Sequence, residues 1–266
     1  MFYSTDQIGQ VVTVSQIPRR IISLVPSQSE FLWDIGISEG RLVGITKFCI
    51  HPNEMFKQII KVGGTKNISI EKIDRLQPDF ILANKEENEM SAVLELKKKY
   101  PVWVSDIKNV GGAYQMMLEV GRICGLQRDA ENIIQRINQV RKDFLLSQPI
   151  HSVRSSVAYF IWKKPLMVAG GNTFIDAMLS EAGFHNVFHD YERYPEVTNE
   201  ILEEIKPYLI FLSSEPYPFS DDDMVAMQHQ FPFAQVKIVD GEMFSWYGSR
   251  LESAYEYFKK LRTDLG

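Results

Sequence analysis

Two pairs of potential metal ligands stand out in the sequence. Cys49 and His51 lie close together in FCIHP, and His185 and His189 lie close together in GFHNVFHD. Thiolate and imidazole groups suit zinc, or the axial position of a haem iron or a cobalt. A structural zinc site needs four ligands at recognisable spacing, and the chain has only 2 cysteines. A single axial contact from Cys49 or His51 to a metal carried by a ligand is therefore favoured over a protein-built metal site.

A pair of carboxylates occupies matching places in a repeated phrase. SIEKIDRLQPDFIL begins at Ser69 and TNEILEEIKPYLIF begins at Thr198, a constant offset of 198 − 69 = 129 residues. Each copy predicts a capped short helix, a proline stop and a buried strand. Glu71 and Glu200 fall just after the caps, where an acidic side chain stabilises a helix by roughly 0.3 to 1 kcal/mol. The repeat predicts the same supersecondary unit once in each half of the chain.

Other candidate site residues lie in the loops that follow the predicted strands. Ligands of α/β sheets bind beyond the carboxyl ends of the strands, and large rigid rings there suit a bulky planar ligand. Packing in the core or in a lid is the alternative for any single ring. Arg250 could meet a carboxylate or phosphate of the ligand, or pair with a surface acid. The residues expected to contact a ligand are Ser27, Gln28, Phe48, His51, Lys85, Trp162, Tyr194, Trp246, Tyr247 and Arg250.

The elements that position these residues alternate between strand and helix. Short apolar runs at 21–25, 42–46, 80–83 and 102–106 predict strands, and Ser27 to Glu30 forms a capping box before a helix that ends at Gly36. Helical spacing covers 113–147 with a break at Gly125, and SVAYFIW then resumes the strand and helix pattern. This alternation is typical of α/β folds with parallel sheets.

The pattern predicts two lobes with parallel sheets and flanking helices, bridged by one long helix from about Asp129. The expected domains are an N-terminal α/β lobe at 1–110, connecting helices including the long one at 111–149, and a C-terminal lobe with a closing helix at 150–266. A ligand site in the cleft between such lobes is expected.

Composition excludes several classes of function. A net charge of −5 without a run of basic residues argues against nucleic-acid binding, and the contexts of the cysteines imply no disulfide framework. The sequence lacks the GxGxxG, P-loop and GxSxG patterns, so an enzyme is not expected. Its N-terminus lacks the basic and apolar regions of an export signal, which keeps a cytoplasmic location open.

Taken in order, SLVPSQSE, LVGITKFCIHP, VGGTKNISIEKIDRLQPDFILA and VTNEILEEIKPYLIFL resemble the helical-backbone substrate-binding proteins of ABC importers for iron complexes and corrinoids. The resemblance runs from about Arg20 to the C-terminus. It implies a monomer of two lobes that holds a corrinoid or an iron chelate such as haem or a siderophore, performs no chemistry on it, and needs no intrinsic cofactor.

The resemblance also implies a partner and a location. Glu71 and Glu200 match the acidic residues that dock into arginine pockets of the membrane permease in this family. Family members act in the periplasm or at the cell surface. A cytosolic corrinoid- or metal-complex-sensing protein of the same fold, without a permease, is the alternative.

Overall fold

The computed structural model describes residues 2–38, 40–148 and 155–265. Its contacts group these residues into two compact units. Unit 1 comprises 1–107, Gly111–Val140 and Trp246–Glu252, and unit 2 comprises Lys108–Val110, Arg141–Ser245 and Ser253–Gly266. The boundary expected between residues 149 and 150 lies outside the described residues. Within the described parts, no helix is both long enough and apolar enough to cross a membrane.

Unit 1 is built on a parallel sheet with the strand order β5-β4-β3-β6-β7, next to an antiparallel hairpin of β1 and β2. Its strands are β1 (Phe2–Thr5), β2 (Val11–Val14), β3 (Ile21–Ser23), β4 (Leu42–Ile45), β5 (Ile60–Lys61), β6 (Phe80–Asn84) and β7 (Val102–Ser105). Its helices are α1 (Pro26–Asp34), α2 (Asn53–Gln58), α3 (Ile70–Leu76), α4 (Met90–Lys97) and most of α5 (Val110–Ile123).

Unit 2 is built on a second parallel sheet with the order β10-β8-β11-β12, and β9 pairs antiparallel with β8. The strands are β8 (Ser156–Trp162), β9 (Met167–Val168), β10 (His185–Asn186), β11 (Leu209–Ser213) and β12 (Gln235–Val239). The helices are α7 (Phe174–Glu181), α8 (Asn199–Ile205), α9 (Asp221–Gln230), α10 (Glu242–Ser245) and most of α11 (Leu251–Leu265).

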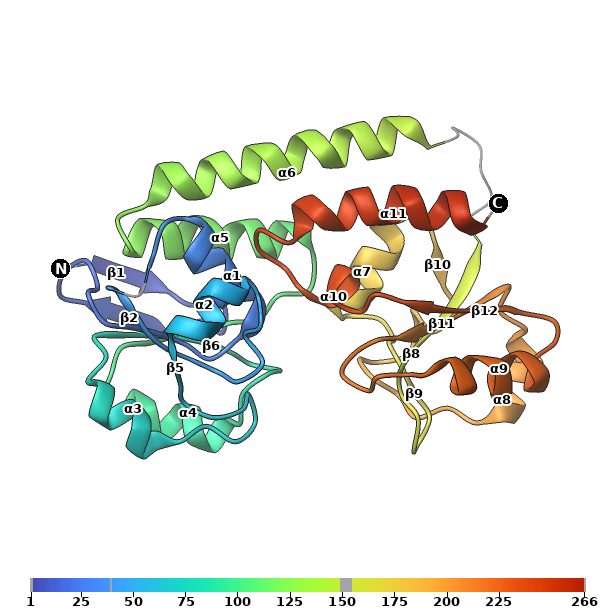
Figure 1. Cartoon of the computed structure of the whole chain (residues 1–266), viewed down its shortest axis with the longest axis horizontal. Coiled ribbons are helices and arrows are strands. Elements are labelled where there is room, and N and C mark those ends of the chain that lie inside the picture. Colours follow the sequence, from blue (N-terminus) through green and yellow to red (C-terminus); the bar gives the residue numbers. More distant parts are fainter. Residues whose placement is uncertain (1, 39, 149–154, 266) are drawn as a thin grey trace. The chain divides into compact units, whose positions relative to one another are not determined.

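The long helix expected from the sequence is α6 (Gln127–Ser147), which is continuous in Figure 1. Its residues up to Val140 group with unit 1 and the rest with unit 2. The predicted break before it is confirmed: Gly125 has φ 72°, a left-handed conformation that glycine adopts without steric cost.

The repeated phrase folds twice into the same helix and strand. Helix α8 corresponds to α3, and strand β11 corresponds to β6, each at the offset of 129 residues seen in the sequence. Ile73 and Leu202 are the matched buried residues of the two helices, each in the apolar core of its own unit. Gln77 and Lys206 end the two helices in the left-handed conformation. The prediction of one supersecondary unit in each half is confirmed.

The N-terminal caps of the two copies differ. The Ser69 side chain accepts a hydrogen bond from the Lys72 backbone N–H at 3.3 Å, whereas Thr198 makes no such bond. Ser69→Ala is therefore expected to lower the free energy of unfolding by about 0.5 to 2 kcal/mol. Thr198→Ala is expected to cost less than half as much. Denaturant unfolding of the two variants tests this, and an equal or larger loss for Thr198→Ala would contradict it.

The predicted capping box at Ser27 to Glu30 is wrong. Helix α1 begins at Pro26, whose missing N–H costs nothing at a first helical position, and Val25 before it provides no side-chain cap. Ser29 lies inside the helix, and its hydroxyl donates to the Val25 carbonyl at 2.8 Å. Proline at the strand end thus starts the helix earlier than the Ser/Glu pattern indicates.

Candidate functional site

Buried polar side chains meet where three strands of unit 1 end. Gln28 follows β3, while Asn84 and Ser105 end β6 and β7. The Asn84 Nδ2 donates to the Ser105 hydroxyl at 2.9 Å and to the Tyr247 hydroxyl at 3.0 Å, and the Gln28 Nε2 donates to the Tyr247 hydroxyl at 3.2 Å. We call Gln28, Asn84, Ser105 and Tyr247 the strand-end network.

The Trp246–Glu252 segment, expected within a C-terminal lobe at 150–266, groups with unit 1. Arg250 donates to both carboxylate oxygens of Glu30 at 2.8 and 2.5 Å, and Ser249 donates to Asp34. Arg250 therefore makes the ion pair that the sequence left as an alternative to ligand binding. An Arg–carboxylate pair of this bidentate form fixes geometry as well as charge.

Ser27, Gln28 and Tyr247, which the sequence suggests as ligand contacts, are buried in unit 1. The structure brings Gln28 and Tyr247 together in the strand-end network, where the Gln28 amide donates a hydrogen bond to the Tyr247 hydroxyl. Burial raises the pKa of the Tyr247 hydroxyl, so it keeps its proton and acts as a neutral hydrogen-bonding group. Direct contact of these side chains with a ligand would require the surrounding residues to move.

Aromatic side chains in and beside the FCIHP loop differ in their exposure. Phe48 is 49% exposed, with the Lys47 ammonium 5.0 Å from its ring centre. His51 packs edge-on against Trp246, with ring centres 5.6 Å apart, although Trp246 itself is only 7% exposed. Phe48 is thus open to a partner, whereas Trp246 mainly supports its neighbours.

Cys49 does not fit the expected role of a metal ligand. Its thiol is buried, and its sulfur lies 3.1 Å from the hydroxyl oxygens of Ser29 and Thr46. Burial raises the pKa of the Cys49 thiol, which disfavours the thiolate that would bind a metal. Local sequence did not predict this burial, because Cys49 lies in a short loop between Phe48 and Ile50, which are both exposed.

A cavity of about 570 Å³ opens in unit 1 beside the ends of β6 and β7. Lys85, a predicted contact residue, lines it together with Asp106, and the two form an ion pair at 2.7 Å. Helix α4 and the turn of the β1–β2 hairpin provide the remaining walls, including the apolar Ile8 and Leu94. The volume falls in the range of small-molecule sites.

In unit 2, Trp162 ends β8 and begins a row of aromatic rings. Its ring centre lies 5.5 Å from that of Tyr217, which lies 4.8 Å from that of Phe219, with edge-on geometry in both pairs. Trp162 is 39% exposed. We call Trp162, Tyr217 and Phe219 the aromatic row. Tyr194, also predicted, is half-buried, with the Arg193 guanidinium 6.0 Å from its ring centre.

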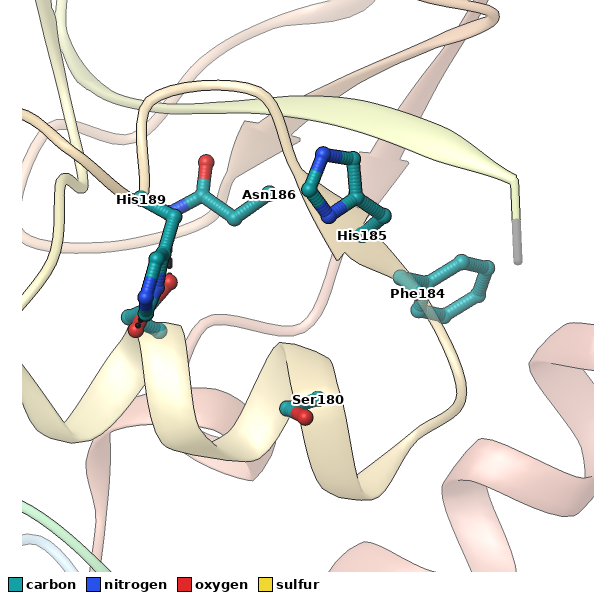
Figure 2. A pocket seen from close by; sticks show the side chains of 6 residues that line it. Ser180, Phe184, His185, Asn186 and His189 are labelled. Carbon is teal, nitrogen blue, oxygen red and sulfur yellow. Dashed lines mark hydrogen bonds and ion pairs between the residues drawn. The ribbon is translucent and has the colours of Figure 1, made fainter.

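The predicted histidine pair lines a smaller cavity of about 260 Å³ in unit 2, shown in Figure 2. The Nδ1 of His189 lies 2.9 Å from Asp176, whose other carboxylate oxygen accepts from Asn186 at 2.8 Å. Figure 2 shows the His185 and His189 rings on separate parts of the cavity wall. Among residues 2–38, 40–148 and 155–265, no three histidines, cysteines or acidic residues are grouped so that they could hold a metal ion.

Sequence reasoning missed Ser105 in the strand-end network and Tyr217 in the aromatic row. Ser105 lies at the end of the predicted strand VWVSD, so the rule that selected Lys85 after β6 could have selected it. Tyr217 lies in SSEPYPF, directly after β11, where closely spaced aromatic residues gave a similar signal.

Glu71 and Glu200 are both exposed at the starts of their helices. Glu71 forms an ion pair with Arg75 one turn later on α3, and both side chains are largely exposed. A hydrogen bond from the Thr198 side chain lowers the pKa of Glu200, so that carboxylate remains charged. Both carboxylates are accessible to a partner.

Comparisons with known proteins agree with this architecture. Residues 21–231 match the family model described as periplasmic binding protein. The chain is 26% identical over 211 residues to an uncharacterised ABC transporter substrate-binding lipoprotein of Bacillus subtilis, covering 76% of this chain and 66% of that protein, just under two thirds of its length. It is also 26% identical over 215 residues to a vitamin B12-binding protein of Yersinia pestis, covering 77% of this chain and 73% of that protein.

The fold is shared with a periplasmic haem-binding protein of Vibrio cholerae. Its structure matches with a TM-score of 0.77 and 17% identity, over 92% of this chain and 98% of that one. The family match spans most of the chain, including both copies of the repeated helix and strand. The chain therefore belongs to the periplasmic binding protein family.

Proposed function

We propose that this chain is the substrate-binding component of an ABC importer, which captures a corrinoid or an iron chelate and delivers it to a permease. The observation that carries the proposal is the exposed aromatic side chain near the strand carboxyl ends of each unit. Phe48 is such a residue in unit 1 and Trp162 in unit 2. Such rings bury much ligand surface while losing little side-chain entropy.

The chemistry of these surfaces suits a large ligand with both planar and polar parts. The aromatic row offers ring edges and faces, while Lys85 with Asp106 in unit 1 offers charged groups near the ends of β6 and β7. The names of the relatives support the same class, since one binds vitamin B12 and another haem. Both ligands are tetrapyrrole-like rings that carry a metal and polar substituents.

The proposed role is binding rather than catalysis. The titratable groups of the strand-end network and its neighbours are engaged with one another: Arg250 with Glu30, Lys85 with Asp106, and Tyr247 with Asn84. A general base at these strand ends would first have to leave its present partner. Capture and release need only the shape and polarity of the surfaces.

Titration with cobalamin, haemin and a ferric siderophore, followed by absorbance, tests the proposal. We expect one of the three to give a saturable spectral change at one equivalent. The same ligand should raise the melting temperature, because a ligand at about 100 times its Kd stabilises the folded state by roughly 2.7 kcal/mol. Absence of saturation with all three would contradict the proposed ligand class.

A further inference from the structure

The orientation of the strand-end network is fixed by the backbone of unit 1. The Oδ1 of Asn84 accepts from the backbone N–H groups of Glu86 and Glu87 at 2.7 and 3.0 Å. The Nδ2 of Asn84 is therefore the atom that faces the hydroxyl groups of Ser105 and Tyr247. Because the carbonyl oxygen of Ala83 accepts from Ser105 at 3.2 Å, strand β6 holds the network from two sides.

Tyr247 connects this network to a segment that has no strand partner of its own. Residues 246–250 belong to no helix or strand, and Gly248 adopts a left-handed φ of 92°. A Cβ at Gly248 would lie 3.2 Å from the Cβ of Phe31 and 3.3 Å from the Ser27 carbonyl oxygen, so the segment runs tightly against α1. Side-chain contacts must therefore hold the backbone of this segment in place, as hydrogen bonds to a neighbouring strand would do in a sheet.

The same contacts determine where Trp246 lies. The Arg250 guanidinium, held by Glu30, is 4.9 Å from the centre of the Trp246 ring, and Trp246 directly precedes Tyr247 in the sequence. Trp246 in turn packs edge-on against His51 of the FCIHP loop. A shift of the segment would move Trp246, and with it the support of the loop that carries the exposed Phe48.

We infer that Tyr247 is a positioning residue whose hydroxyl, bonded to Gln28 and Asn84, fixes the Trp246–Arg250 segment. Through the buried Trp246, this segment sets the shape of the ligand surface formed by Phe48 and His51. The inference rests on the proposed function for the identity of that surface. Tyr247 is only 6% exposed, so its effect on binding reaches the ligand through Trp246 rather than by contact.

Unit 2 provides a matched control in Tyr159. Its hydroxyl lies 3.0 Å from that of Ser213, and Ser213 occupies the position in β11 that Asn84 occupies in β6. Tyr159 is fully buried, but it lies within β8 and pairs with Phe211 of β11, so the sheet holds its backbone. Removing this hydroxyl deletes a comparable buried hydrogen bond without releasing a segment.

The test compares Tyr247→Phe with Tyr159→Phe by hydrogen exchange and by ligand affinity. We expect Tyr247→Phe to speed amide exchange in peptides covering 246–252 by about tenfold or more, because the hydrogen bonds of the hydroxyl with Gln28 and Asn84 are both lost, whereas Tyr159→Phe leaves these peptides unchanged. Affinity for whichever of cobalamin, haemin or ferric siderophore binds should fall about five- to tenfold in Tyr247→Phe. It should stay within about twofold in Tyr159→Phe.

The outcomes separate this inference from the proposed function. Unchanged exchange at 246–252 in Tyr247→Phe, or faster exchange with unchanged affinity, would overturn the inference. If the wild-type chain binds none of the three ligands, the proposed function fails, and the exchange comparison still decides whether the hydroxyl orders the segment. Should Tyr247→Phe not fold, Ser105→Ala removes a shared hydroxyl of the network while keeping the phenol, and faster exchange at 246–252 is expected again.

Discussion

Replacing Trp162 with alanine is expected to weaken ligand binding by about thirtyfold or more, which corresponds to the roughly 2 kcal/mol of an interface hot spot. Trp162 ends β8 with 39% of its surface exposed, and its ring packs against Tyr217 with edge-on geometry. The exposed part of the ring can pack on a planar ligand, and the alanine substitution removes that contact. Because the ring is partly exposed, the free energy of unfolding should change much less than for a core aromatic residue.

Phe233→Ala is the matched control for this prediction. Phe233 is 38% exposed and packs against Phe231, but it precedes β12 and so lies at the amino end of the same parallel sheet. Affinity by absorbance titration and melting temperature should be measured for both variants. Unchanged affinity in Trp162→Ala, or an equal loss in Phe233→Ala, would show that the aromatic row is not the ligand surface.

Trp246 cannot serve the same purpose, although the sequence placed both tryptophans after predicted strands. At 7% exposure it contacts His51 and the Arg250 guanidinium, so Trp246→Ala is a core truncation that removes stability as well as shape. The two residues differ in burial because Trp162 remains at the end of its own strand. Trp246 instead packs against residues of unit 1 that are distant in sequence.

Local signals predicted the repeated helix and strand well. Ser69 as a cap, Pro78 and Pro207 after the helices, and the apolar runs of β6 and β11 are all determined by neighbours within a few residues. Elements too short to carry such local signals were missed. Strands β5, β9 and β10 each have only 2 residues, too few to show any periodicity, and they form through pairing with longer strands.

The contacts that build the candidate site could not be read from local sequence. The pair of Glu30 and Arg250 joins residues separated by 220 positions, and Gln28 and Tyr247 are separated by 219. Gln28, Tyr247 and Arg250 were expected to contact a ligand, with an ion pair as the alternative for Arg250. The fold places Gln28 against Tyr247 in the interior and Arg250 against the part-buried Glu30. A buried polar group is costly without a partner, and the hydroxyl and amide NH₂ groups of the strand-end residues pair with one another, while among the described residues the Gln28 Oε1 has no such partner.

Reversing the charges of Glu71 and Glu200 together is expected to abolish ligand uptake while leaving ligand affinity unchanged. Both residues are exposed at the first turn of matched helices, so the chain carries two equivalent carboxylates that a partner with two basic pockets could bind. As helix-start acids they contribute only roughly 0.3 to 1 kcal/mol each to stability. The loss of uptake should therefore far exceed any loss of folded protein.

Uptake of labelled ligand by cells that express the variant with its cognate permease measures the effect, with ligand titration of the purified variant alongside. The matched control is Glu203→Lys with Glu204→Lys, because both residues are exposed on α8 and produce the same change in net charge away from its first turn.

Normal uptake in the Glu71 and Glu200 variant would leave these carboxylates as helix-start residues only. Equal losses in both double variants would indicate a general charge effect. Loss confined to Glu71 and Glu200, with ligand binding intact, would mean that the repeated helix start is a pair of permease contacts, since the roughly 0.3 to 1 kcal/mol that each contributes to stability is too small to abolish uptake.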